Sequence, residues 1–188
     1  MSAALGTLAF LSVTIAMGAN WLLSHLNVKE AWWFSAPTVA TTFGILYLLM
    51  DKAAWRWRFV RRLGLVDTPI VEGEYVGTLE STYQGTVLPV KISIDQTWNR
   101  IAVRFQVSEP KTSTSYSMTA GLGKVGHDIA RLTYTYRNQI KPGVADSDMN
   151  DHDGTAELNI NFETGSAMGR YFNFRGRQGS LNLERSKF

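Results

Sequence analysis

The chain has 188 residues, of which 45% are hydrophobic and 19% charged, and it contains no cysteine. The lack of cysteine excludes disulfides, Cys-ligated zinc, iron–sulfur clusters and a Cys nucleophile. A formal net charge of +3 is too small to indicate binding to a DNA or RNA polymer.

Two uncharged segments near the N-terminus predict a membrane hairpin. Residues 2–28 contain no Asp, Glu, Lys or Arg, and residues 31–50 form a second such run after Lys29 and Glu30. A helix needs about 20 apolar residues to cross a bilayer, so each run is long enough for one crossing. We therefore expect two transmembrane helices joined by a short polar turn.

Two other interpretations of these segments compete with the hairpin. A cleaved signal peptide would begin with positive charge and would have a shorter apolar core than the first run. A buried helical hairpin of a soluble protein would need more covering surface than the rest of the chain offers to two helices that are apolar all round.

A basic segment follows the second run and predicts the orientation of the hairpin. Residues 51–62 carry five Lys or Arg side chains, whereas the hairpin turn carries only Lys29. Positive charge close to the end of a transmembrane helix stays in the cytoplasm, so both termini are expected there. The same side chains, next to Trp55 and Trp57, suit contact with anionic lipid headgroups.

Small residues recur along one face of the second run. Ala36, Ala40 and Gly44 are spaced four residues apart, and small side chains let transmembrane backbones approach closely. This ridge can serve packing within one hairpin or association between copies of the chain. Because neither span contains an acidic or basic residue, a proton relay or an ion-transport site is not indicated.

Beyond Gly64 the hydrophobic pattern has a period of two, which is typical of antiparallel strands. We therefore separate the hairpin with its basic segment, residues 1–64, from an all-β domain, residues 65–188. Each predicted strand has one apolar face, and no amphipathic helix is available to cover the sheet. The pattern predicts about eight strands closed into a small antiparallel barrel that can hold a small ligand, with a two-sheet sandwich as the alternative. The predicted strands are residues 70–80, 88–95, 100–107, 113–122, 130–137, 155–162, 167–174 and 178–184.

The predicted barrel offers little for catalysis, and we expect no enzyme. His127 and His152 are its only imidazoles, and it has no nucleophile elbow, metalloprotease motif or phosphate-binding loop. Residues 146–157 match the ligand spacing of a calcium loop, but Asp151 replaces the glycine that such a loop requires. We interpret this segment as a solvated loop and expect neither a metal nor a cofactor.

Aromatic, amide and basic side chains of the barrel match the needs of a nucleotide ligand. Bases stack on aromatic rings, and guanidinium groups donate hydrogen bonds to phosphates. Strand tyrosines also fill cores and arginines also lie in solvent, so both interpretations remain open for each residue. The residues concerned include Tyr134, Tyr136, Asn138, Arg170, Tyr171, Arg175 and Arg177.

A series of short motifs in this order resembles one family along essentially the whole chain. The motifs are EGEYVG at 72–77, DQTW at 95–98, STSYS at 113–117, LTYTYRN at 132–138, HDGT at 152–155, GRYF at 169–172 and RGRQG at 175–179. Together with the hairpin, they are similar to those of the two-transmembrane, β-barrel effectors of bacterial cyclic-oligonucleotide-based antiphage signalling (CBASS). Tyr75 stands where that family usually has a Trp.

The resemblance implies a receptor and an effector in one chain at the bacterial inner membrane. In that family a nucleotidyltransferase (CD-NTase) makes a cyclic dinucleotide during phage infection, and the barrel binds it. Binding drives homo-oligomerisation, and the assembled transmembrane segments disrupt the inner membrane and kill the infected cell. The resemblance implies ligand contacts by Tyr75, Trp98, Tyr134, Tyr136, Asn138 and His152, with Arg175 and Arg177 as phosphate donors.

The main alternative function is that of a membrane-tethered, lipocalin-like carrier of a small hydrophobic ligand. A carrier would have an apolar cavity without convergent phosphate donors, so replacing Arg175 and Arg177 would leave its ligand binding intact.

Overall fold

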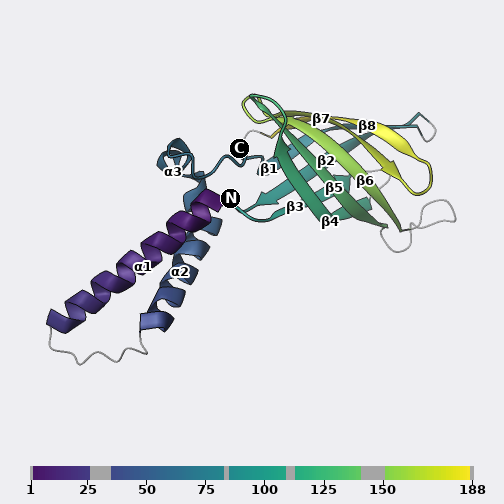
Figure 1. Ribbon diagram of the computed structural model, residues 1–188. Coiled ribbons are helices and arrows are strands. Elements are labelled where there is room, and N and C mark those ends of the chain that lie inside the picture. The colour runs from purple at the N-terminus through teal and green to yellow at the C-terminus, as the bar shows by residue number, and fades with distance from the viewer. Residues whose placement is uncertain (1, 26–34, 83–84, 109–112, 141–150, 187–188) are drawn as a thin grey trace. The chain divides into compact units, whose positions relative to one another are not determined.

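The computed structural model describes residues 2–25, 35–82, 85–108, 113–140 and 151–186 of the chain (Figure 1). The chain divides into two compact units, residues 1–67 and residues 68–188. The first unit is helical and the second is built from strands, and each is described by itself.

The first unit contains the predicted helical hairpin. Its elements are α1 (Ser2–His25), α2 (Ser35–Lys52), the 3-10 helix η2 (Ala54–Arg56) and α3 (Arg58–Arg62). α1 contacts α2, and α1 buries Ala4, Leu8, Ser12 and Ala16, which lie four residues apart on one face. The small side chains on this face let the two helix backbones approach each other.

Only part of the predicted pair of membrane spans can be followed in the structure. Among the described residues, one helix, Ala3–His25, is long and apolar enough to cross a membrane. α2 has 18 residues and begins at Ser35, and residues 26–34 lie outside the described part of the chain. The second crossing therefore stays a prediction.

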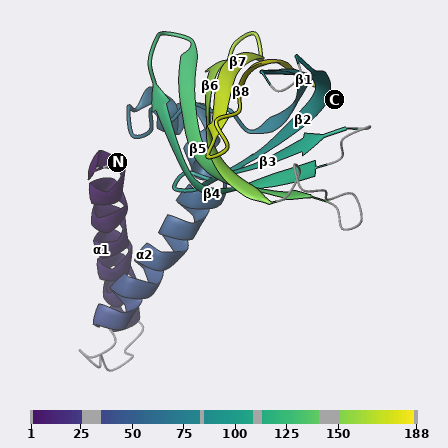
Figure 2. The same cartoon turned by 90° about the vertical axis from the view of Figure 1, so that its right-hand side faces the viewer.

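The second unit is a closed antiparallel barrel of eight strands (Figure 2). Each strand pairs with the next along the chain, and β8 pairs with β1. Buried apolar residues alternate with outward polar ones, as the period of two predicts. The predicted barrel is confirmed, and the two-sheet sandwich is wrong. The strands are β1 (Gly73–Ser81), β2 (Val87–Gln96), β3 (Ile101–Val107), β4 (Ser113–Lys124), β5 (Ile129–Ile140), β6 (His152–Asn161), β7 (Ser166–Asn173) and β8 (Gln178–Arg185).

A glycine allows the first and last strands to close the barrel. Gly77 of β1 lies opposite Leu183 of β8, and a Cβ built on Gly77 would overlap the carbonyl oxygen of Asn182. Any larger residue would therefore force the two strands apart, so glycine is required where they meet.

Buried side chains, among them Gln96, fill the end of the barrel next to residues 69–71. Gln96 is 4% exposed, accepts a hydrogen bond from the Val71 N–H (2.9 Å) and donates one to the Pro69 carbonyl (2.9 Å). These bonds hold residues 69–71 against the end of β2. β1 consequently begins at Gly73 and not at residue 70, because a side chain and not a strand ladder satisfies this backbone.

Candidate functional site

A cavity of about 130 Å³ lies at the opposite end of the barrel. It is formed where β1, β3, β5 and β7 end and where β2, β4, β6 and β8 begin. Its apolar and aromatic lining comprises Leu79, Leu88, Phe105, Val107, Tyr134, Tyr136, Ala156, Tyr171 and Leu181. Its polar lining comprises Ser81, Thr86, Ser113, Ser115, Asn138, His152, Asn173, Arg175 and Arg177.

Two tyrosines of β5 supply an aromatic wall with available hydroxyls. Tyr134 and Tyr136 are 3% and 7% exposed, and their ring centroids lie 6.2 Å apart with the planes tilted by 55°. Burial raises the pKa of both phenols well above the usual value, so both stay neutral at physiological pH. Among the described residues neither hydroxyl has a hydrogen-bond partner. Both can therefore donate to, or accept from, a molecule in the cavity.

A glycine on the neighbouring strand seats the Tyr136 ring. Gly154 of β6 lies opposite Tyr136, and a Cβ built on Gly154 would overlap the Tyr136 hydroxyl and lie 2.7 Å from the Phe172 carbonyl oxygen. The tyrosine ring thus occupies the space that a side chain at residue 154 would fill.

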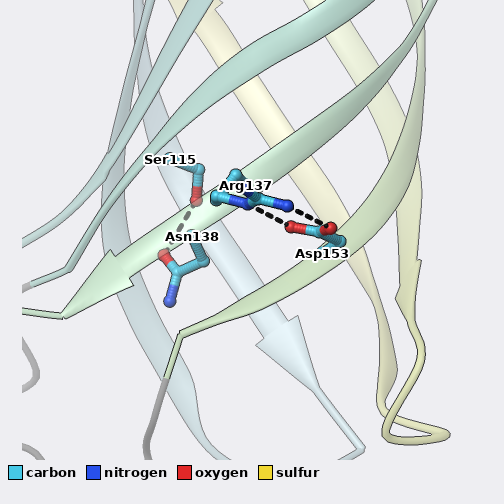
Figure 3. Close-up of polar contacts among 4 residues, drawn as sticks. All are labelled: Ser115, Arg137, Asn138 and Asp153. Atoms are coloured by element: carbon cyan, nitrogen blue, oxygen red, sulfur yellow. Dashed lines mark hydrogen bonds and ion pairs between the residues drawn. The ribbon is translucent and has the colours of Figure 1, made fainter.

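Asn138 presents an amide to the cavity in a fixed orientation (Figure 3). The Ser115 hydroxyl on β4 donates a hydrogen bond of 2.8 Å to the Asn138 Oδ1, and both side chains are buried. Within the described part of the chain, the Asn138 amide nitrogen has no partner. Asn138 therefore offers N–H donors, and a ligand atom that meets it must be an acceptor.

A salt bridge outside the barrel joins the two strands that carry Asn138 and His152. Arg137 donates from Nε and from one terminal nitrogen to the Asp153 carboxylate, at 2.8 and 2.9 Å (Figure 3). These hydrogen bonds hold the pKa of Asp153 below its usual value. Asn138 and His152 are the next pair in the same ladder, so the salt bridge supports their position at the cavity.

Arg175 and Arg177 lie in the tight turn between β7 and β8. The Asn173 Oδ1 accepts hydrogen bonds from the backbone N–H groups of Arg175 (3.0 Å) and Arg177 (3.1 Å). Gly176 between them has a φ of 70°, a conformation that favours glycine. The turn therefore places both arginines at the cavity.

A further polar contact crosses the cavity end of the barrel. Tyr171 of β7 and Ser81 of β1 share a hydrogen bond of 2.9 Å between their hydroxyls, although β8 lies between the two strands. This bond ties the strands on either side of β8 together where they line the cavity.

The arrangement suits an anionic ligand with aromatic rings. Aromatic walls accept stacked rings, neutral hydroxyls and amide N–H groups contact ring edges, and guanidinium groups bind phosphates in a bidentate manner. The described residues contain no group of three His, Asp or Glu side chains that could hold a metal ion. Residues 146–150 of the acidic segment lie outside the described part of the chain.

Comparison with family models covers nearly the whole chain. A model described as the Cap15 cyclic dinucleotide receptor domain matches residues 66–185. The chain belongs to the Cap15 family. A second model, described as the Cap15 TM helices, matches residues 3–56. None of the curated proteins compared with the chain matches it.

Membership of the Cap15 family confirms the resemblance to CBASS effectors. This Cap15 chain carries a cyclic dinucleotide receptor barrel and is anchored in the membrane by N-terminal helices. The barrel that contains the cavity lies within the matched receptor domain, and the family models identify no catalytic domain.

The structure brings six of the eight predicted ligand residues of this Cap15 chain to one cavity and places two elsewhere. Tyr75 is 2% exposed and donates a hydrogen bond of 2.9 Å to the Val71 carbonyl at the filled end of the barrel. Trp98 is 8% exposed in the turn between β2 and β3, also at the filled end. Neither of these two residues lines the cavity. The six at the cavity are Tyr134, Tyr136, Asn138, His152, Arg175 and Arg177.

Sequence analysis did not identify Asn173 and Ser115, whose hydrogen bonds hold parts of the Cap15 cavity in place. Asn173 precedes an Arg-Gly-Arg turn, and an Asn side chain that binds backbone two residues on is a known turn signal that could have identified it. Ser115 carried no such signal, because its partner Asn138 is 23 residues away in the chain.

The small-residue ridge of the Cap15 hairpin is divided between two environments. The side chain of Ala36 lies outside the described residues. Ala40 and Ser12 line a groove between α2 and α1, whereas no atom lies within 4 Å of a Cβ built on Gly44. Ala40 is exposed at this groove, and Gly44 has room for a larger neighbour, so the role of the ridge in association stays a prediction.

Proposed function

We propose that the open end of the barrel is the cyclic dinucleotide site of this Cap15 chain. The observation that supports it most is the convergence of Arg175 and Arg177 on a cavity walled by Tyr134 and Tyr136. A cyclic dinucleotide needs ring-stacking surface and phosphate donors in one place, and this cavity contains both.

The size of the cavity suggests which part of the ligand lies inside the barrel and which part lies at its mouth. Sites that enclose a whole drug-sized ligand measure roughly 300–1,000 Å³. The cavity of about 130 Å³ is smaller, so it takes one base while the phosphates meet the two arginines. The Asn138 amide then donates a hydrogen bond to an acceptor on the edge of that base.

Ligand binding is proposed to drive assembly of the membrane helices. A ligand shifts an equilibrium only by binding one state better than the other, so the messenger must prefer the associated form of the receptor. Holding barrels together raises the local concentration of hairpins, and weak helix contacts then add up. The assembled helices disrupt the inner membrane, and the cell dies.

The proposed topology has two crossings with both termini and the barrel in the cytoplasm. The basic segment at residues 51–62 supports this orientation. A cytoplasmic barrel meets the product of a CD-NTase directly, without transport across the membrane.

Calorimetry on the full-length chain in detergent tests the proposed site. We expect cyclic dinucleotides to bind the wild type, and Arg175→Ala and Arg177→Ala each to weaken binding by about tenfold or more, since a charge-assisted hydrogen bond contributes about 1.5–3 kcal/mol. Arg170→Ala is the matched control, because Arg170 lies on β7 with a 72% exposed side chain outside the barrel. No binding by the wild type, or equal loss in all three variants, would refute the site.

A further inference from the structure

Strand β4 pairs with β5 along nearly its whole length but with β3 along only a third of it. β3 and β4 pair only between Arg104–Val107 and Ser113–Tyr116, although β4 continues to Lys124. At the end of this ladder the Val103 N–H donates to the Ser117 hydroxyl (2.9 Å) and not to backbone. Among the described residues, residues 117–123 of β4 pair with β5 alone. We call residues 117–123 the β4 edge.

Alternate residues of the β4 edge have backbone N–H and C=O groups that point away from β5, within the plane of the sheet. The Val125 N–H donates to the Ile129 carbonyl (3.0 Å), which closes the hairpin between β4 and β5. In an antiparallel ladder, alternate residues direct both N–H and C=O toward the partner strand. The backbone groups of Gly121 and Gly123 therefore bond to β5. The N–H and C=O groups of Ala120 and Leu122 point the other way, to the side of β4 where no described strand pairs with them. Such groups form a template for another strand.

Side chains along the β4 edge do nothing to block another strand. Proteins usually protect an edge with charged residues or proline, and residues 117–123 contain neither. Gly121 and Gly123 are exposed and have no atom within 4 Å of a built Cβ, and neither has a positive φ. Neither a positive φ nor a close neighbour therefore explains why glycine occurs at these two positions, where it weakens the strand. Glycine inside a strand often marks the close approach of another backbone.

We propose that the β4 edge pairs antiparallel with the β4 edge of a second copy across a two-fold axis. A two-fold axis places the same segment opposite itself, so a charged segment would meet its own charge. Residues 117–123 are uncharged and avoid this repulsion, which is why a second copy fits better than a charged peptide. The two barrels then share one continuous sheet. This inference rests on the proposed function, in which the ligand drives assembly.

The β4 edge continues directly from strand segments that line the cavity. Phe105, Val107, Ser113 and Ser115 all face the cavity, and all lie in the short ladder between β3 and β4. A ligand that holds these residues fixes the start of β4, and the edge begins two residues after Ser115. Ligand binding therefore orders the strand that the second copy must pair with.

Single-cysteine cross-linking tests this pairing directly. The chain contains no cysteine, so each variant reports only its own contact. Residues 118–123 are replaced one at a time in the full-length chain in lipid nanodiscs, and oxidised with and without a cyclic dinucleotide. We expect a ligand-dependent disulfide dimer that peaks at one or two adjacent positions on the two-fold axis. Thr133→Cys is the control, because Thr133 is exposed on β5 directly opposite Gly121. Equal cross-linking at Thr133, or none along the β4 edge, would overturn the proposal.

A charge placed on the β4 edge separates this inference from the proposed function. Gly121→Lys sets two positive charges close together in the dimer, and Thr133→Lys adds the same charge one strand away from the edge. We expect both variants to retain ligand binding, and only Gly121→Lys to weaken assembly, by about tenfold or more. If Gly121→Lys assembles like the wild type, the proposed pairing of two β4 edges is wrong, whereas the proposed ligand site is unaffected. A wild type that binds ligand without assembling would instead contradict the proposed function.

Discussion

Buried phenols shape both the ligand cavity and the stability of the barrel. Tyr134 and Tyr136 have hydroxyls that burial keeps neutral, with pKa values raised above the usual value. In the unfolded chain the same groups ionise near pH 10. The neutral tyrosines therefore add no negative charge to the cavity, and they link the stability of the fold to alkaline pH.

The stability of the barrel should fall as the pH rises above 10. There the unfolded state releases phenolic protons while the folded state retains them, so the unfolded state gains stability. Between pH 8 and pH 11 each such tyrosine lowers the free energy of unfolding by about 1 kcal/mol. Chemical denaturation of the full-length chain, followed by circular dichroism, measures this loss. Tyr134→Phe should lose less than the wild type over the same range, and an equal loss would contradict the assignment.

Gly154 should be a positioning residue for ligand binding. In Gly154→Ala the new methyl group overlaps the Tyr136 hydroxyl and displaces its ring into the cavity. We expect the affinity for a cyclic dinucleotide to fall by about tenfold or more, because displacing the ring changes the shape of the site. Gly126→Ala, where a Cβ would meet the Ile129 side chain at an ordinary contact distance of 3.7 Å, is the control in the same calorimetric assay. Wild-type affinity in Gly154→Ala would show that the ring position is unimportant.

At the scale of elements, periodicity predicted the barrel but not which end is open. Alternation within each strand depends on neighbouring residues, so the eight strands could be recognised from the chain itself. The filled end depends on Gln96 binding residues 69–71, which are about 25 residues away in the chain. Tyr75 and Trp98 were therefore predicted as ligand residues although they lie at the filled end.

At the cavity end, the sequence pattern likewise did not predict where the strands begin and end. Asn138 and His152 belong to the site because β5 extends to Ile140 and β6 begins at His152, three residues beyond the predicted limits in each case. Pairing between the two strands, and not local pattern, extends them. Residue types suited to a nucleotide could be recognised from the sequence, but their convergence needed the register of the barrel.

The helical hairpin carries a prediction of its own at Gly44. No atom lies within 4 Å of a Cβ built at this position, so Gly44→Leu fits within one hairpin. If Gly44 lies between copies, leucine keeps their backbones apart and weakens helix association. We expect unchanged ligand affinity and reduced dye leakage from ligand-treated proteoliposomes. Gly18→Leu on α1, also without a neighbour within 4 Å, is the control. Full leakage with Gly44→Leu would show that the ridge of small residues plays no part in membrane disruption.

At the scale of the whole molecule, a receptor barrel and membrane helices occur in one chain of the Cap15 family. In the proposed function, assembly is the step that links the ligand site to the membrane helices. This linkage makes membrane damage depend on the affinity of the cavity, and it requires every copy to carry both parts.

Release of a self-quenched dye from liposomes that contain the full-length chain tests this linkage most directly. We expect a cyclic dinucleotide to trigger leakage from liposomes with the wild type or Arg170→Ala, and to trigger little with Arg175→Ala or Arg177→Ala. Leakage that is the same with and without ligand, or tight ligand binding by the wild type without any leakage, would contradict the account of this protein as a messenger-gated membrane effector.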